Sequence, residues 1–542
     1  MNRMRRIGGA LVVLVGLVTV LAPSAASAHA LLVSSSPAPS SVLPRSPERI
    51  DLTFSEDVEA GLSGIRLFDA AQKEIGIGKT TKGTSGSVVS ATVPSLQNGM
   101  YVVVWRVTSK DGHPVNGAFP FEVGTVSTGN GNELMERVAA AVQRTSPLGG
   151  VLSAAKFVSF IGFVLLVGIM AFTWGTQFLG SARALTGVLS GLFLLLLGSL
   201  AVLLLQGAYV TGGGWSDIGR FSLVADVLQT RVGLAVLARM VIAVLWVLLV
   251  QILRRDEWNS VTSALVSVLG VLTVVTFSLA GHPAAGSLPG VFVVVDALHF
   301  AGVGVWVGGL FTMWLLRREV TSDPALLPAA ERFSRNVSWS MPLVVVTGVV
   351  QGLHLVGGPG RIGDTDYSWN LVAKTALVLF IILVGARARK MMSLDGGVSR
   401  RFVDAVRFEA IVAVVVLVLT AGLVNSSPVA GVAPLETFSA RLVQRSIIAE
   451  ITVTPPRVGK AEIHALFTPP GGSLAPVKSV TVRMTLQAKD VPAIPVEMLQ
   501  VGANHWSGVV QIPYSGNWSV EFLVEPDANS KLRYSTTIPV KD

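Results

Sequence analysis

Residues 185–210 read LTGVLSGLFLLLLGSLAVLLLQGAYV and contain no charged side chain. This apolar run is longer than the roughly 20 residues that an α-helix needs to cross the hydrocarbon core of a bilayer. Backbone polar groups in that core must be satisfied within the segment itself, which favours a helix. The run therefore predicts a membrane-spanning helix.

Further apolar segments of the same kind lie on both sides of this one. The chain of 542 residues is 51% hydrophobic and only 14% charged, with a mean hydropathy of +0.62. We expect region 148–428 to be a transmembrane α bundle of eight helices. Their expected positions are near 151–173, 185–210, 231–253, 261–281, 290–316, 337–356, 370–386 and 408–425.

Basic residues gather in alternate loops of this region, at 174–184, 254–260, 317–336 and 387–407. Cytoplasmic loops of membrane proteins carry such an excess of Lys and Arg. The pattern predicts a multi-pass protein of the bacterial cell membrane with its N- and C-terminal domains on the extracytoplasmic side. The net charge of +9 is thus accounted for by topology, and we expect the lipid bilayer, and no nucleic acid, as a partner.

The regions that flank the bundle have the alternation typical of β-strands. Residues 50–54 and 101–107 indicate strands in a first extracytoplasmic domain, 29–125, which we expect to be a small β-sandwich. Residues 126–147 are expected to form a linker that is helical around 133–142. A second extracytoplasmic β domain, 429–542, is predicted from strands at 451–453, 480–486, 506–512 and 518–524.

Residues 1–28 have the organisation of a secretory signal peptide. Arg3, Arg5 and Arg6 precede an apolar stretch, and Ala26 and Ala28 form the cleavage pattern. An uncleaved anchor is the alternative, although the apolar stretch is short for a spanning helix. Cleavage after residue 28 would expose a new N-terminal residue.

That residue would be His29, whose α-amine and ring nitrogen can chelate one metal ion. Nitrogen donors of this kind suit Cu(II). Asp111-Gly112-His113-Pro114 could supply the rest of a coordination sphere. The chain has no Cys, which excludes thiolate ligands. The alternative is that Asp111 and His113 only build a turn before a strand.

Region 29–125 resembles the CopC copper-binding proteins. The resemblance rests on His29-Ala30, Ser35-Ser36-Pro37, 52–56 (LTFSE), Trp105-Arg106-Val107 and 109–114 (SKDGHP). It implies an Ig-like β-sandwich with a Cu(II) site formed by the His29 amine and ring, Asp111 and His113. Glu56 aligns with an acidic residue sometimes placed near that site. Met100 is the single methionine in 29–125, so we expect no separate Cu(I) site there.

Polar residues inside the apolar segments are candidates for a copper pathway, because charges in a bilayer are costly. Asp296 and His299 are spaced i, i+3 and share a helix face. His299 could instead make a hydrogen bond between helices. The other candidates are His282, which could simply be exposed, His354, Met240 and Met341.

Most of 148–428 resembles the CopD membrane proteins, through 298–301 (LHFA), 305–310 (VWVGGL), 332–334 (RFS), Lys374 and 407–409 (RFE). CopC joined to CopD is the arrangement of the YcnJ-like copper resistance and transport proteins. The C-terminal domain loosely resembles the YtkA-like β-sandwiches through 516–520 (GNWSV). Its candidate copper ligands are His464, His505 and Met498, for each of which packing is the alternative.

These resemblances imply copper binding and movement across the plasma membrane. We expect Cu(II) capture by the N-terminal domain and transfer to the membrane domain, for copper import and homeostasis, and no enzymatic activity. An extracytoplasmic copper chaperone or cuproprotein is the expected protein partner. Copper resistance by sequestration or export, a membrane haem or copper redox protein and an oxidative copper enzyme are the alternatives.

Overall fold

The computed structural model describes most of the chain in two compact units. One contains Ala30, 108–114 and the helices from 146 to 426, and the other contains both β regions. The signal peptide 1–28 and His29 lie outside the described residues. These are 30, 32–39, 41–83, 85–124, 131–142, 146–174, 181–255, 258–285, 288–317, 327–363, 365–394, 400–426, 438–445, 447–468, 477–489, 491–502, 504–527 and 530–541.

The first β region contains two sheets with strand orders β1-β3-β7-β6 and β2-β9-β8-β4-β5. Buried and exposed residues alternate along Arg49–Phe54, which fits a strand with one face on a core. Strand β8, Gly99–Thr108 of the other sheet, is buried along most of its length. The strands are β1 Leu32–Ser36, β2 Val42–Leu43, β3 Arg49–Phe54, β4 Gly64–Asp69, β5 Glu74–Ile75, β6 Thr81–Lys82, β7 Val88–Thr92, β8 Gly99–Thr108 and β9 Pro114–Val123.

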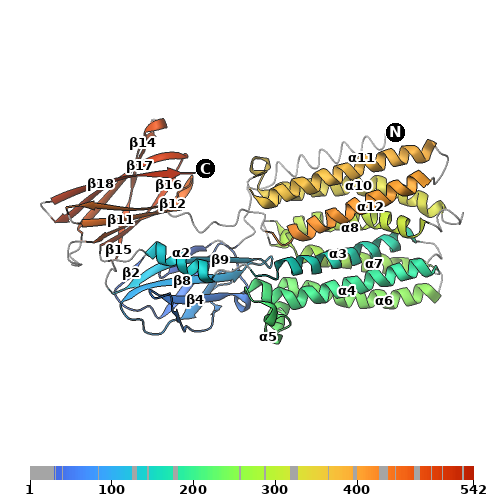
Figure 1. Ribbon diagram of the computed structural model, residues 1–542, viewed down its shortest axis with the longest axis horizontal. Coiled ribbons are helices and arrows are strands. Elements are labelled where there is room, and N and C mark those ends of the chain that lie inside the picture. The colour runs from blue at the N-terminus through green and yellow to red at the C-terminus, as the bar shows by residue number, and fades with distance from the viewer. Residues whose placement is uncertain are drawn as a thin grey trace. The chain divides into compact units, whose positions relative to one another are not determined.

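The expected linker contains a helix, α2 (Gly131–Val142), which packs on this β region (Figure 1). Its buried residues Leu134 and Val138 join a core cluster with Val102 and Val104 of β8. Met100, the methionine of the first domain, is buried in the same cluster. The helix predicted around 133–142 is thus confirmed, and Met100 has a packing role.

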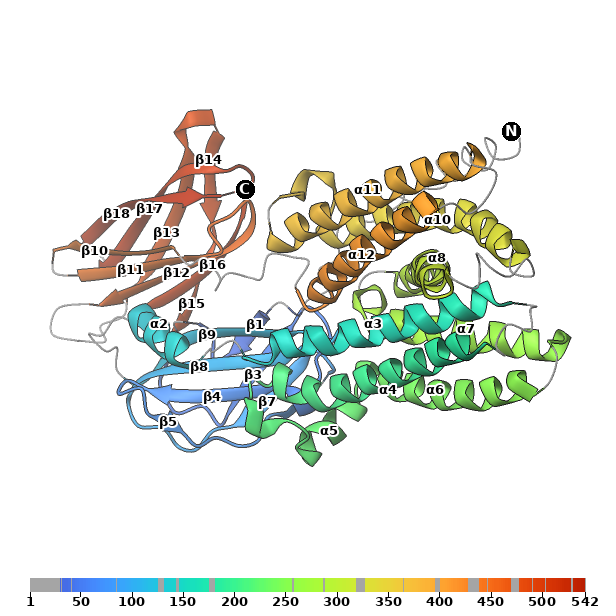
Figure 2. The same cartoon turned by 45° about the vertical axis from the view of Figure 1, so that its right-hand side comes forward.

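The helical unit contains eight helices that are long and apolar enough to cross a membrane, counted over the described residues. Each covers one of the eight predicted segments, and a short helix, α5 (Phe221–Leu228), was not predicted. Figure 2 shows α8 between α3 and the group of α10, α11 and α12. The long helices are α3 Gly149–Phe172, α4 Ala182–Val210, α6 Arg231–Arg255, α7 Ser260–Leu279, α8 Pro289–Leu315, α10 Leu327–Val356, α11 Asp366–Leu394 and α12 Arg400–Leu423.

Glycines allow α3 and α8 to approach closely. A Cβ atom built on Gly168 would lie 2.2 Å from the backbone of Gly308, and one on Gly309 would lie 1.9 Å from the ring of Phe333. Small residues at helix interfaces permit such contacts in membranes. Gly308 therefore lets α8 pack closely on α3, and Gly309 makes room for the ring of Phe333.

The C-terminal β region also has two sheets, with strand orders β10-β11-β12-β16-β15 and β14-β13-β17-β18. The buried Trp518, Phe522 and Phe467 belong to a core to which strands of both sheets contribute. The predicted strands correspond to β11, β13, β16 and β17. The strands are β10 Phe438–Gln444, β11 Ile447–Thr454, β12 Gly459–Thr468, β13 Ser479–Leu486, β14 Val491–Val496, β15 Met498–Gly502, β16 His505–Ile512, β17 Gly516–Asp527 and β18 Ser530–Val540.

Candidate metal centre

The loop between β8 and β9 is a tight turn organised around the Asp111 carboxylate. Oδ1 of Asp111 accepts a hydrogen bond from the Ser109 hydroxyl and another from the His113 backbone N–H at 3.1 Å. Gly112 has φ +83°, a left-handed conformation that favours glycine. The sequence Ser-Lys-Asp-Gly-His therefore folds locally so that the side chains of Asp111 and His113 point the same way.

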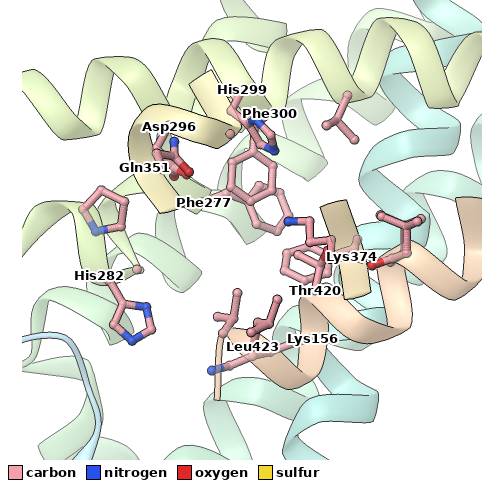
Figure 3. Close-up of a pocket in the computed structure, with 18 of the residues that line it drawn as sticks. Lys156, Phe277, His282, Asp296, His299, Phe300, Gln351, Lys374, Thr420 and Leu423 are labelled. Carbon is pink, nitrogen blue, oxygen red and sulfur yellow. Dashed lines mark hydrogen bonds between the residues drawn. The ribbon is translucent and has the colours of Figure 1, made fainter. Parts of the chain in front are cut away.

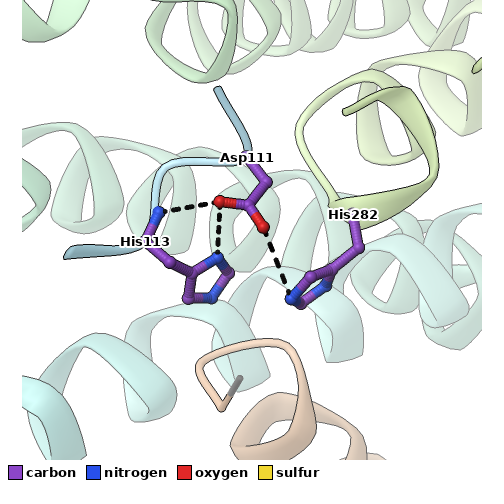
Figure 4. A group of neighbouring side chains, drawn as sticks. All are labelled: Asp111, His113 and His282. Carbon is purple, nitrogen blue, oxygen red and sulfur yellow. Dashed lines mark hydrogen bonds and ion pairs between the residues drawn. The ribbon is translucent and has the colours of Figure 1, made fainter. Parts of the chain in front are cut away.

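A histidine from the helical unit completes the group. His282 begins the short helix η4 (His282–Ala284) that follows α7, and it is buried. Its Nε2 lies 3.9 Å from Oδ2 of Asp111, and its ring stacks on that of His113 with centroids 4.6 Å apart (Figure 4). The candidate ligand atoms of Asp111, His113 and His282 all lie within 4.8 Å of one another. We refer to these three residues as the Asp111 cluster.

The protonation of His113 points to a cation in this cluster. Its Nε2 lies 3.0 Å from the backbone carbonyl of Val424, which can only accept a hydrogen bond, so Nε2 carries a proton. In the neutral ring Nδ1 then carries a lone pair, 3.1 Å from the carboxylate Oδ1 of Asp111. Two acceptors at this distance are stabilised by a cation between or beside them. A second proton on the ring or a metal ion would serve, and imidazole and carboxylate ligands suit Cu(II).

Helix ends hold the loop in place within this unit. Gln206 near the end of α4 donates from Nε2 to the Gly112 carbonyl at 2.8 Å. Arg231 at the start of α6 donates to the carbonyls of Lys110, at 2.9 Å, and Ala284. Arg231 thereby links the loop that carries Asp111 to the segment that carries His282.

A cavity of about 230 Å³ connects the Asp111 cluster with polar residues of the helices. All three cluster residues line it, and so do Asp296 and His299 of α8. Figure 3 shows His282, Asp296 and His299 around this cavity. At 1.5 Å per residue, Asp296 lies roughly 10 Å and His299 roughly 15 Å along α8 from its start. Most of the remaining lining is apolar, with Phe160, Phe163, Phe277, Phe300 and several valines.

His299 is held by α10. Its Nδ1 lies 3.1 Å from the Val344 carbonyl and 3.0 Å from the Thr347 hydroxyl. The carbonyl can only accept, so Nδ1 carries the proton and Nε2 carries the lone pair. The hydrogen bond between helices is therefore present. A metal-binding histidine commonly donates its other N–H to a backbone carbonyl in the same way, so this bond is compatible with a ligand role.

Three cations also line the cavity: Lys156 of α3, Arg239 of α6 and Lys374 of α11. Lys156 donates to Oδ1 of Asn425. Arg239 donates to the Thr276 hydroxyl at 3.0 Å and carbonyl at 2.9 Å, and lies 3.5 Å over the Phe277 ring. The structure thus gathers these residues, which belong to three different helices, around one cavity.

The remaining candidates do not join this cavity in the part of the chain that the structure describes. His354 stacks on Phe292 with ring centroids 3.6 Å apart. Met341 packs against the bundle core, and Met240 is half-buried on α6. Glu56 follows β3 in the other unit. His29 lies outside the described residues, but Ala30 is fully buried and belongs to the unit that contains 108–114.

The C-terminal candidates separate into two groups. His464 and His505 are neighbours, with Nδ1 and Nε2 3.0 Å apart. Met498 packs against the core of the domain. It pairs with Gly508 in register, on the opposite face of the sheet from His464 and His505.

Comparisons with protein families account for most of the chain. The CopC domain matches residues 32–124. The copper resistance protein D-like N-terminal domain matches 147–291, and copper resistance protein D matches 327–423. The chain belongs to the CopC–CopD fusion family. Family membership establishes a multi-pass membrane protein of the copper transport and resistance class with a CopC-like β domain at its N-terminal end.

Individual relatives agree with this assignment. The chain is 25% identical over 484 residues to the copper transport protein CutJ of Bacillus subtilis, covering 85% of each chain. It is 32% identical over 111 residues to copper resistance protein C of Pseudomonas syringae pv. tomato, covering 19% of this chain and 87% of that protein. The crystal structure of CopC from Methylosinus trichosporium OB3b is 31% identical in sequence, with a TM-score of 0.17, covering 19% of this chain and all of that one.

The approach of His282 to Asp111 is the feature that sequence reasoning missed. The predicted topology puts both the 109–113 loop and the end of the fourth apolar segment on the outer side of the membrane, and this shared side is the signal that could have paired them. The same prediction puts His354 on the outer side, yet its ring stacks on Phe292. Topology gives the side of the membrane, whereas side-chain packing decides which histidine meets the loop.

Proposed function

We propose that this CopC–CopD fusion protein captures Cu(II) outside the cell and conducts copper inward through its helical domain. The observation that carries the proposal is the single cavity lined by both the Asp111 cluster and the Asp296–His299 pair. A metal ion released from Asp111 and His113 would meet its next ligands without leaving this cavity. The signal-peptide pattern of residues 1–28 and the basic residues of alternate loops support an extracytoplasmic location for residues 29–125 and 429–542.

Capture would use the α-amine and ring of His29 with Asp111 and His113. These donors form a nitrogen- and oxygen-rich set that suits tetragonal Cu(II). His282 would be the first acceptor inside the helical domain, because its ring stacks on that of His113.

Onward transfer would use Nε2 of His299, since Nδ1 of that ring is held by Val344 and Thr347. The fixed cation of Arg239 beside Phe277 would weaken copper binding along the way. Weak intermediate binding is what conduction requires, because an ion must be able to leave each position. The geometry thus favours a carrier over permanent sequestration.

Cellular copper content tests the proposal. Cells that express the chain should accumulate more copper than cells without it, and His299→Gln and His282→Gln should each return accumulation at least halfway to the control. His354→Gln is the matched control, since His354 does not line the described cavity, and it should leave accumulation unchanged. Lower copper in expressing cells would reject import and favour export or resistance.

A further inference from the structure

A second group of histidines lies on the C-terminal domain, outside the cavity. His464 of β12 and His505 of β16 lie on neighbouring antiparallel strands, where His464 pairs with Ser507 and Leu466 pairs with His505. The residues between them along each strand, such as Ile463, Ala465 and Trp506, face the sandwich core. The two histidines therefore share the other face of the sheet, and they are still only 8% and 1% exposed.

Hydrogen bonds fix the orientation of His464. Ser507 donates from its hydroxyl to Oε1 of Glu462 at 3.0 Å, and the same carboxylate oxygen lies 3.2 Å from Nε2 of His464. A carboxylate accepts, so Nε2 of His464 carries the proton and Nδ1 carries a lone pair. That lone pair is directed at Nε2 of His505, 3.0 Å away.

The turn before β16 fixes His505. Asn504, with φ +58°, accepts from the backbone N–H of Phe467 at 3.0 Å and, through Oδ1, from that of Val477 at 2.7 Å. Nδ1 of His505 is buried and has no hydrogen-bond partner among the residues that the structure describes.

We propose that His464 and His505 form a second copper site, in which a metal ion takes the place of the proton shared by Nδ1 of His464 and Nε2 of His505. This inference goes beyond the transport proposal, because the pair is separate from the cavity. On binding, the proton of the neutral His505 ring moves from Nε2 to Nδ1, so that Nε2 becomes a ligand, and no redox change is involved.

The geometry of the pair suits a metal ion. With metal–nitrogen bonds of about 2.0 Å, two nitrogens 3.0 Å apart subtend an angle of roughly 97° at the metal. The ion would therefore lie beside the line that joins the two nitrogens, and both rings would turn toward it. That angle lies close to the square arrangement that Cu(II) prefers with nitrogen and oxygen ligands. Glu462 would act as the orienting carboxylate behind a metal-binding histidine, an arrangement common in metal sites.

The pair also has the character of an exchange site. In a purely structural pair we expect every buried nitrogen to have a hydrogen-bond partner, whereas Nδ1 of His505 has none within the described part of the chain. With only two protein ligands, solvent or the ligand of a partner would complete the coordination sphere. Glu462, with its side chain 51% exposed, lies at the solvent side of His464. A site of this kind suits transfer of copper to or from another molecule.

Cu(II) titration of the full-length protein in detergent tests this site. An Asp111→Asn/His113→Ala variant, which disables the Asp111 cluster, should still bind one Cu(II) ion. Its electron paramagnetic resonance spectrum should show nitrogen ligands. Adding His505→Gln should weaken that binding at least 100-fold. Adding His354→Gln instead is the matched control and should change nothing.

Glu462→Gln guards against a loss of binding that is caused by misfolding. The side chain of Glu462 is 51% exposed, so the substitution should not disturb the fold, and it leaves both imidazoles in place. It should keep the same stoichiometry with an affinity lower by about 10-fold, the range found when an orienting carboxylate is lost. The proposal is overturned if the Asp111→Asn/His113→Ala variant binds no nitrogen-coordinated Cu(II). It is also overturned if His505→Gln and Glu462→Gln both leave the affinity unchanged.

Discussion

The Asp111 cluster and the His464–His505 pair contain the same local chain of contacts in different surroundings. In each, a serine hydroxyl donates to a carboxylate, Ser109 to Asp111 and Ser507 to Glu462, and that carboxylate contacts a histidine ring. The side chain of Asp111 is fully buried, whereas that of Glu462 is 51% exposed.

The position of each group in the fold determines which other ligands a bound ion can reach. The Asp111 carboxylate lies near two histidines, one of which follows α7, and all three residues line a cavity. Glu462 and His464 belong to one strand, and His505 to the next. An ion bound by the Asp111 cluster could move along the cavity. An ion bound by His464 and His505 would be held by two neighbouring strands of one sheet.

The largest expected effect comes from the ligand common to capture and transfer. His113→Ala removes a ring that lies 3.1 Å from Asp111 and stacks on His282. Tight Cu(II) binding by the full-length protein should fall at least 100-fold, as measured by competition with a chelator of known affinity. His354→Gln is the control. Unchanged tight binding after His113→Ala would remove the Asp111 cluster from the capture site.

A smaller effect is expected from the backbone that supports each group. Gly112 and Gly459 both have positive φ, +83° and +117°, so Ala at either position should cost about 1–2 kcal/mol of stability. A Cβ on Gly112 would also lie 3.0 Å from Val232 and 3.3 Å from Gln206, whereas one on Gly459 meets nothing within 4 Å.

Gly112→Ala should therefore also displace Asp111 and lower the affinity of the Asp111 cluster for Cu(II) by about 10-fold. Gly459→Ala should lower only the melting temperature. Isothermal titration combined with thermal unfolding separates the two results. Equal affinity losses in both variants would mean that the loop tolerates the crowding at Val232 and Gln206.

Hydropathy and alternation predicted much of the fold, because long apolar segments and alternating strands are local features. All eight spanning segments coincide with helices, and the strands at 50–54 and 101–107 lie within β3 and β8. Strand β12 was missed because two of its inward residues are the small Ala461 and Ala465, which give a weak alternation.

The candidate site was less predictable, because its parts are joined by tertiary contacts. Asp111 and His113 follow from a short motif, and their proximity is local. His282 meets them through tertiary contacts, among them the hydrogen bonds of Arg231 to the carbonyls of Lys110 and Ala284. No local pattern encodes that link. Likewise, nothing in the spacing of His464 and His505 indicates that β12 and β16 are neighbours in the sheet.

The smallest expected effect distinguishes the two serines. Ser109→Ala and Ser507→Ala each remove one hydrogen bond to a carboxylate, which contributes roughly 0.5–1.5 kcal/mol in proteins. Asp111 is shielded from water, so loss of the Ser109 hydroxyl leaves a buried oxygen with fewer donors. At Glu462, a water molecule can take the place of the Ser507 hydroxyl.

Ser109→Ala should therefore weaken Cu(II) binding at the Asp111 cluster several-fold, while Ser507→Ala should change binding at the His464–His505 pair less than twofold. Titrations of both variants in parallel measure the difference. A larger loss for Ser507→Ala would mean that the exposed carboxylate, rather than the buried one, depends on its serine for orientation.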